Sequence, residues 1–161
     1  MTGDRSLLDP APPRLDFAFH IAAEVGPPLS GGGGLAGERL HIPILGGTVA
    51  GPRLQGRVLP GGSDWPLIRP DGAAAIMARY TIQAADGTPI MVRNAGLRIA
   101  DPADVQRMRA GEPVPPATYY FRSTPCFDVP DGPHAWMRDR IFLASLAPSG
   151  REVHIDVYTV E

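Results

Sequence analysis

The chain has 161 residues, of which 43% are hydrophobic and 20% charged, and its formal net charge is −2 at neutral pH. This composition is typical of one soluble globular domain, and its slightly acidic balance argues against nucleic acid as a partner. The single cysteine, Cys126, excludes an internal disulfide and a zinc site built on cysteines.

The chain has no pattern that would direct it to a membrane. No apolar run approaches the roughly 20 residues of a membrane helix, and the first residues lack a signal-peptide pattern. We therefore expect a cytoplasmic protein without a membrane partner. Residues 1–14 are polar and contain prolines, so we expect a flexible tail before a single domain over residues 15–161.

The first half of the domain contains several strand patterns. Residues 15–22 alternate between large apolar side chains and smaller or polar ones, which predicts a strand. Residues 26–37 include four consecutive glycines and predict a mobile loop. Residues 38–51 and 53–62 predict two further strands, and Gly56 in the second indicates a bulge or a close backbone approach.

A hairpin and a helix follow in the middle of the chain. Residues 73–96 contain two apolar runs around Asp86 and Gly87, a dipeptide suited to a type I′ turn. Residues 101–113 predict a short helix, because Asp101 suits the N-cap and Pro102 suits the first helical position.

Three more strands are expected over residues 118–129, 134–147 and 151–161. The middle segment could also form an amphipathic helix, but its bulky end favours a strand. About eight strands with one short helix predict an all-β protein, either an antiparallel sandwich or a closed barrel. A small barrel commonly holds one small ligand in its lumen.

Familiar catalytic and metal motifs are missing from the sequence. The glycine-rich residues 46–56 lack the lysine and the following helix of a phosphate-binding loop. The four histidines show no metal-binding spacing, although a barrel could bring two of His20, His41 and His154 together. Cys126 lies between proline and phenylalanine, which favours a buried apolar cysteine over a nucleophile.

A set of polar and aromatic residues on the predicted strands remains as the candidate site. Asp64 lies at the end of a strand, where a barrel would have its mouth, and could pair with an arginine. Equally, Asp64 could cap the turn through its own backbone while Trp65 packs into the core. Alternation allows only one residue of each adjacent pair to face a lumen. The candidate catalytic residues are Asp64, Arg79 and Tyr80, and the candidate substrate-binding residues are Arg57, Trp65, Asn94, Tyr120, Phe121, Arg122 and Trp136.

Four segments carry a family resemblance: "GTVAGPRLQGRVLPGGSDW", "ARYTIQAADGTPIMVRNAG", "YYFRSTPCFD" and "AWMRDRIFLA". They resemble the DUF3237 (UPF0311) family, and the resemblance covers nearly the whole chain from about residue 15. It implies a small antiparallel β-barrel of the lipocalin or allene-oxide-cyclase kind. The chain departs from the family pattern after Trp136, where Arg138 and Asp139 stand near an expected asparagine.

These observations favour an enzyme that needs no cofactor or metal and acts on an apolar or aromatic carbonyl compound. Its reaction would be of the isomerase, cyclase or lyase type. Asp64 would transfer the proton, with its pKa raised by Trp65 and a dry pocket, and Tyr80, Arg79 or Asn94 would stabilise an oxyanion. Two alternatives remain open: a lipocalin-like binding protein for a hydrophobic metabolite, and a structural subunit that forms a homodimer.

Overall fold

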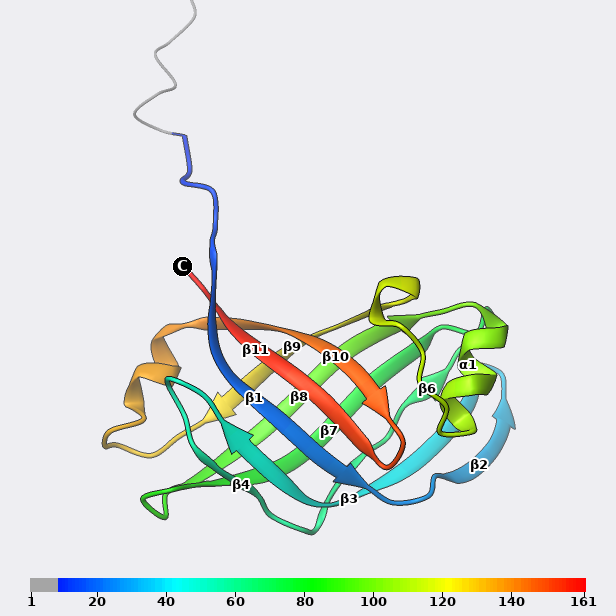
Figure 1. Ribbon diagram of the computed structural model, residues 1–161, viewed down its shortest axis with the longest axis horizontal. Helices are drawn as coiled ribbons and strands as arrows, with labels where there is room; N and C mark the ends of the chain where they lie inside the picture. The colour runs from blue at the N-terminus through cyan, green and yellow to red at the C-terminus, as the bar shows by residue number, and fades with distance from the viewer. Residues whose placement is uncertain (1–8) are drawn as a thin grey trace, which may run out of the picture.

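The protein was analysed as a computed structural model, which describes residues 9–161 (Figure 1). These residues form eleven strands, one α-helix and two 3-10 helices. In chain order they are β1 (Leu15–Val25), β2 (Leu29–Gly34), β3 (Gly37–Ala50), β4 (Gly56–Val58), β5 (Gly62–Asp64), β6 (Leu67–Ile68), β7 (Ala74–Ala84), β8 (Pro89–Ile99), α1 (Pro102–Arg109), η2 (Pro116–Thr118), β9 (Tyr120–Asp128), η3 (Ala135–Asp139), β10 (Ile141–Ser149) and β11 (Glu152–Val160).

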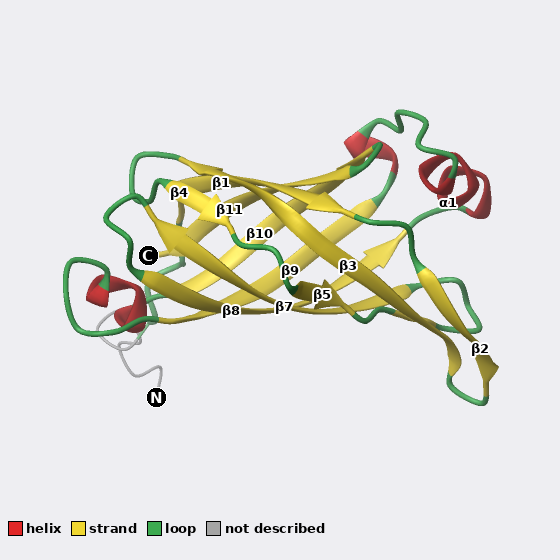
Figure 2. Ribbon diagram, turned by 90° about the horizontal axis from the view of Figure 1, so that it is seen from below, coloured by secondary structure: helices red, strands yellow, loops and turns green. Residues whose placement is uncertain are grey.

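The strands form one antiparallel sheet that closes on itself. The hydrogen-bonded order runs β1, β11, β10, β9, β8, β7, β4 and β3, and β1 pairs with β3 to complete the circle. Strand β2 lies outside this circle and forms a hairpin with β3, which extends from one end of the barrel (Figure 2). The predicted all-β class is thus confirmed, and of the two architectures left open the closed barrel is the observed one.

One position in the barrel wall is occupied by three short strands instead of one long strand. Each of β4, β5 and β6 pairs with β3 on one side and β7 on the other. We call these three strands the interrupted stave. With it, the barrel has eight positions: β1, β3, the interrupted stave, β7, β8, β9, β10 and β11.

The interior of the barrel is filled by alternate residues of each strand, as expected for a closed sheet. On β7, for example, every second residue from Ala74 to Ala84 is buried, and the residues between them are more exposed. Large apolar side chains dominate the centre of the barrel. The largest fully buried ones are Phe19, Ile21, Ile82, Ile90, Val92 and Val157.

The two ends of the barrel are covered by different elements. Helix α1 and the β2–β3 hairpin lie at one end, and η3 lies at the other (Figure 2). At the η3 end, Trp136 packs against Phe142, with ring centroids 5.9 Å apart. Arg53 lies over the Trp136 ring at 3.7 Å from its centroid. The η3 end therefore carries an aromatic pair with a cation over it, whereas a helix and a hairpin lie at the α1 end.

Several expected elements differ from the observed ones. The glycine run predicted as a loop forms strand β2, because Ser30 and Leu29 pair with β3 across the hairpin. The segment predicted as one strand over residues 134–147 begins with η3 and continues as β10. The hairpin turn at Asp86 is not type I′, because Asp86 has a negative φ and only Gly87 is left-handed, at 90°. The predicted helix at residues 101–113 is confirmed as α1.

The N-terminal tail can be compared with its prediction only in part. Residues 1–8 lie outside the described residues. Residues 9–14 are exposed and form no regular element. At the end of this segment, the backbone of Arg14 exchanges two hydrogen bonds with Glu161, each 2.8 Å long.

Glycine at position 62 allows the interrupted stave to lie against β7. A Cβ atom there would lie 2.5 Å from the Tyr80 Cβ and 2.6 Å from the Arg79 carbonyl oxygen. Gly56 has the same role in β4, where a Cβ would overlap the Gln83 carbonyl oxygen. The close backbone approach predicted at Gly56 is therefore confirmed.

We expect Gly62→Ala to lower the free energy of unfolding by about 1–3 kcal/mol, the usual effect of overpacking a close contact. Gly33→Ala in β2 is the matched control, because a Cβ there meets no atom within 4 Å. Urea unfolding of both variants measures the difference. Equal stability of the two variants would contradict the role given to Gly62.

Candidate functional site

The interrupted stave places one carboxylate in the barrel wall. Asp64, the last residue of β5, lies opposite Ile42 on β3 and Ala78 on β7. Directly opposed residues in a sheet project to the same face, and Ala78 belongs to the core. Asp64 therefore faces the lumen, as the sequence predicted.

Asp64 also holds its own strand in place. Its Oδ1 accepts a hydrogen bond from the Met77 amide at 3.0 Å, and the Trp65 amide donates to the Met77 carbonyl at 3.1 Å. The carboxylate thus continues the hydrogen-bond ladder for one step beyond β5. Asp64 is both a structural link and a lumen-facing acid.

Burial raises the pKa of Asp64 to about 6, because the charged form loses hydration inside the barrel. The amides of Met77 and Trp65, and more weakly the charge of Arg98, act in the opposite direction without cancelling this effect. A carboxyl group with this pKa exchanges protons near neutral pH. The sequence predicted a pKa raised by Trp65 and a dry pocket; burial is the cause, and the Trp65 amide lowers the pKa.

Asn94 lies in the same row of the sheet as Asp64. Ala78 on β7 pairs with Asp64 on one side and with Asn94 on the other. Two strand spacings, about 10 Å, therefore separate the carboxylate strand from the carboxamide strand. Between these two strands, the lumen face of this row carries only the small side chain of Ala78.

Tyr80 lies two residues from Ala78 on the same face of β7, and it is 6% exposed. Burial raises the pKa of its hydroxyl, and the charge of Asp64 raises it further, so the phenol stays protonated and can donate a hydrogen bond. Tyr80 and Asp64 thus share one region of the lumen. The sequence predicted both residues for the site.

Five buried polar atoms in or beside this region have no hydrogen-bond partner among residues 9–161. Buried polar groups are normally paired, so a cluster of unpaired ones calls for an explanation. Four of them belong to residues on β7, β8 and β9 that share the lumen face with buried neighbours. The atoms are Tyr80 Oη, Asn94 Oδ1, Arg98 Nε, Tyr119 Oη and Ser123 Oγ.

Arg98 and Ser123 were missed by sequence reasoning. Gly96 pairs with Ser123, and Arg98 pairs with Phe121, so alternation along β8 and β9 places them on the lumen face with Asn94. The alternation of inward and outward side chains could have found them, because it continues from Asn94 to Gly96, the partner of Ser123, and to Arg98. Sequence reasoning stopped at the asparagine and did not extend the alternation to the end of β8.

Three predicted site residues lie on the outer face of the barrel instead of in the lumen. Arg79 is exposed, because it alternates with the buried Tyr80. Arg57 is exposed and donates two hydrogen bonds to Gln83 Oε1, at 2.8 and 3.0 Å. Trp65 is 39% exposed and stacks on His41 with centroids 5.5 Å apart, because it follows Asp64 and points outward.

The aromatic set on β9 divides in the same way. Phe121 is buried on the lumen face, as one member of the pair was expected to be. Tyr120 and Arg122 are exposed, and the Arg122 guanidinium lies 5.6 Å from the Tyr120 ring centroid. The predicted substrate-binding placement of these two residues is therefore wrong. Trp136 lies in η3, at the end of the barrel opposite α1, and packs against Phe142 there.

Two other sequence expectations concern residues outside the lumen. His20 Nε2 and His154 Nδ1 are 3.1 Å apart, so the barrel does bring two histidines together, on neighbouring strands β1 and β11. His20 Nδ1 also contacts Asp156 Oδ1 at 2.7 Å. Cys126 is exposed on β9, so the expectation of a buried cysteine is wrong.

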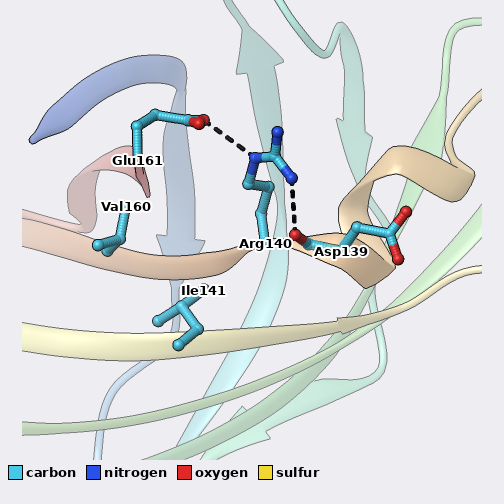
Figure 3. Close-up of a pocket in the computed structure, with 5 residues that line it drawn as sticks. All are labelled: Asp139, Arg140, Ile141, Val160 and Glu161. Carbon is cyan, nitrogen blue, oxygen red and sulfur yellow. Dashed lines mark hydrogen bonds and ion pairs between the residues drawn. The ribbon is translucent and has the colours of Figure 1, made fainter. Parts of the chain in front are cut away.

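Two hollows lie on the outer surface, away from Asp64. One is at the C-terminal end of the chain, where Arg140 Nε donates to Glu161 Oε1 at 3.1 Å and Arg140 Nη1 donates to the Asp139 carbonyl at 2.8 Å (Figure 3). The other lies along β7 and β8 and includes the exposed Arg79 and Met91. The first hollow is separate from the polar group in the lumen, whereas the second is also lined by Gly62 and Tyr80.

Metal and membrane features are limited in the described part of the chain. Residues 9–161 contain no group of three or more His, Cys, Asp or Glu side chains arranged to hold a metal ion. The helices of this part are also too short and polar to span a bilayer.

The fold and the site define a small closed barrel with an acid and unpaired polar groups inside an apolar wall. The family of proteins of unknown function DUF3237 matches residues 13–160, and the chain belongs to this family. Its relatives include a UPF0311 protein of Rhodopseudomonas palustris, 38% identical over 89% of this chain and 94% of that protein. A UPF0311 protein of Bradyrhizobium diazoefficiens is 38% identical over 92% of this chain and 98% of that protein.

Solved structures show the same architecture. A conserved protein of unknown function from Rhodopseudomonas palustris is 34% identical, with a TM-score of 0.90 over 94% of this chain and 100% of that chain. A β-barrel-like protein from Acinetobacter baumannii is 31% identical, with a TM-score of 0.82 over 95% and 99%. An enzyme from Penicillium herquei is 22% identical, with a TM-score of 0.71 over 95% and 98%, and shares the fold.

We expect Asp64→Asn to stabilise the protein at high pH and to leave its stability unchanged near pH 4. The native pKa of about 6 lies above the ordinary value of 3.8, so the native protein loses stability as the pH rises from about 4 to about 6 and keeps that loss at higher pH. At pH 8, the variant should therefore exceed the native protein in free energy of unfolding by about 3 kcal/mol, the equivalent of about two pKa units. The asparagine oxygen can still accept the Met77 hydrogen bond.

Urea unfolding of the native protein and the variant at pH 4, 6 and 8 measures this effect. Subtracting one curve from the other removes the contribution of all other titrating groups. A difference that stays constant from pH 4 to pH 8 would contradict the raised pKa.

Proposed function

We propose that the protein is an enzyme that acts on an apolar or aromatic carbonyl compound in the barrel lumen by acid–base chemistry without a cofactor. Its reaction belongs to the isomerase, cyclase or lyase type. The observation that carries this proposal is the position of Asp64, which faces the lumen with a pKa of about 6 beside the unpaired hydroxyl of Tyr80. A general acid or base works best when its pKa lies near the working pH.

The two residues suit the two requirements of enolate chemistry. The Asp64 carboxylate accepts a proton from the carbon next to the carbonyl, and the electron pair of the broken C–H bond moves toward the carbonyl oxygen. Tyr80 donates a hydrogen bond to that oxygen as it becomes negative. Asp64 then returns the proton to another carbon in an isomerisation, or to a leaving group at the β-carbon in an elimination.

The surrounding wall suits an apolar substrate body. Ala78 on β7 offers only a methyl group beside Asp64, and the buried Ala74 and Phe121 flank Arg98 on the same inner face. Asn94 faces the same region and adds a polar contact that can orient the substrate. This combination of an apolar wall and few polar groups is typical of small-molecule sites.

The comparisons support this proposal only at the level of the fold. The enzyme from Penicillium herquei shares the barrel at 22% identity, so barrels of this shape can carry catalysis. The activity assigned here depends on the residues of this chain.

We expect the protein to catalyse hydrogen–deuterium exchange at the α-carbon of 2-tetralone, an aromatic ketone used here as an enolisable probe. Proton NMR in D₂O measures the loss of the α-proton signal. Asp64→Asn should slow the protein-dependent rate by about 10²–10⁴-fold, the usual contribution of a positioned acid–base group. Asp16→Asn, an exposed carboxylate on β1, is the matched control and should leave the rate unchanged.

The same assay separates an enzyme from a carrier. A lipocalin-like binding protein would bind the ketone without accelerating exchange, and Asp64→Asn would have no effect on the rate. Exchange at the buffer rate, with or without binding, would refute the proposed function.

The exchange rate should depend on pH through one ionisation near pH 6. Only the carboxylate form of Asp64 accepts a proton, so kcat/KM should fall about tenfold for each pH unit below 6 and level off above pH 7. Exchange rates from pH 4.5 to 8 measure this profile. A profile that is flat through pH 6 would assign the base to another group.

A further inference from the structure

Arg98 brings a cation to the α1 end of the lumen. It lies near the end of β8, where it pairs with Ala74 on one side and Phe121 on the other. Both neighbours are buried, at 0% and 6% exposure, so Arg98 shares their lumen face. Its Nε atom is buried and has no hydrogen-bond partner among residues 9–161.

No carboxylate of the described chain compensates this cation at close range. Among residues 9–161, neither Arg98 nor Asp64 forms an ion pair within 4.0 Å, although both face the same lumen. The charge of Asp64 raises the pKa of Arg98 only weakly compared with the effect of burial, which lowers it. The two groups therefore face one lumen without pairing with each other.

A second arginine lies at the same end of the barrel, in the helix that follows β8. Arg109 is the last residue of α1, and its charge lowers the pKa of Arg98 further. On the same helix, Arg107 is paired with Asp104 and Glu112, whereas Arg109 has no such ion pair in the described chain. Two arginines at one end of the barrel that form no ion pair within residues 9–161 attract an anion.

We propose that the lumen binds an organic acid, whose anionic group pairs with Arg98 and Arg109 at the α1 end of the barrel. This inference rests on the proposed function, because it names the substrate class of the same site. The Arg98 guanidinium offers a planar set of donors that matches a carboxylate in a bidentate arrangement and can also bind a phenolate. Ser123, one strand away, adds an unpaired hydroxyl.

The arrangement orients the substrate along the barrel wall. Arg98 lies four residues beyond Asn94 on β8, and Asn94 lies in the row of Asp64. An anion at Arg98 therefore places the body of the acid between the arginine and the Asp64–Tyr80 pair. The reacting carbon would lie several bonds away from the acidic group.

Binding of 1-naphthoate and its neutral isostere 1-naphthamide tests the inference by calorimetry. The native protein should bind the acid at least tenfold more tightly than the amide. Arg98→Gln should weaken naphthoate binding by about 10- to 100-fold, the usual effect of losing charge-assisted hydrogen bonds, and leave naphthamide binding unchanged. Arg98→Lys keeps the charge, so its naphthoate affinity should lie between those of the native protein and Arg98→Gln. This variant provides the test if Arg98→Gln does not fold.

Arg122→Gln is the matched control. Arg122 lies one register step from Arg98 on the neighbouring strand but faces outward. Its substitution should therefore leave the affinities for naphthoate and naphthamide unchanged. Binding of 1-naphthol above its phenol pKa, compared with naphthoate, distinguishes a phenolate ligand from a carboxylate ligand. Equal affinity for acid and amide, an equal loss in the Arg98 and Arg122 variants, or no naphthoate binding by the native protein would overturn the inference.

This result can be separated from that of the proposed function. The calorimetric preference for the acid requires no turnover, and the ketone exchange assay requires no acidic group on the probe. Loss of exchange in Asp64→Asn without any preference for naphthoate would retain the enzyme and reject the organic acid as its substrate class.

Discussion

Closure of the sheet by the pairing of β1 with β3 is the constraint on which the rest of the structure depends. Once the sheet is a barrel, each strand has one lumen face and one solvent face, and alternation assigns every side chain to one of them. The same rule buries Tyr80 and exposes Arg79, and it buries Phe121 and exposes Tyr120. The composition of the lumen is thus decided by closure and register together.

The two charged residues of the lumen, Asp64 and Arg98, are positioned by different kinds of strand. Arg98 belongs to a long regular strand, β8, and its position follows from alternation alone. Asp64 ends a three-residue strand, and its carboxylate replaces a backbone acceptor in the ladder to β7. The backbone around Asp64 is held by Gly62, which permits close contact with β7, so the acid has little freedom to move. Preorganisation of this kind is what an acid–base group requires.

The lumen keeps these polar groups at a cost in stability. Ionisation of Asp64 at neutral pH opposes folding, and the oxygens of Asn94 and Ser123 lose hydration without gaining a partner among residues 9–161. The apolar centre of the barrel, around Phe19, Ile82 and Val157, offsets these losses. Stability that is given up at one cluster and supplied elsewhere is typical of functional sites.

Much of the fold could be predicted from the sequence, because period-two alternation and turn residues mark most of the long strands. The helix over Pro102–Arg109 was also predictable from its proline and its flanking residues. The three fragments of the interrupted stave were not separated by sequence reasoning, because strands of two or three residues carry no measurable periodicity. Of the site, Asp64, Tyr80 and Asn94 were found on the lumen face as predicted.

The rest of the site could not be predicted, because the face of each strand depends on register that only closure defines. Arg57, Trp65 and Arg122 carry the residue types of a binding site and lie outside. Arg98 has an ordinary sequence context and lies inside. A single residue of shift along any of these strands would exchange the two sets.

The division of one stave into three fragments also decides where the chain can change in length. In a continuous strand, an inserted residue turns every following side chain to the opposite face. In the interrupted stave, β4 and β5 each have their own register with β3 and β7, so residues added between them, where Pro60 and Gly61 are exposed, extend a loop. Length variation can therefore accumulate before Asp64 while the other seven positions of the barrel keep their pairing.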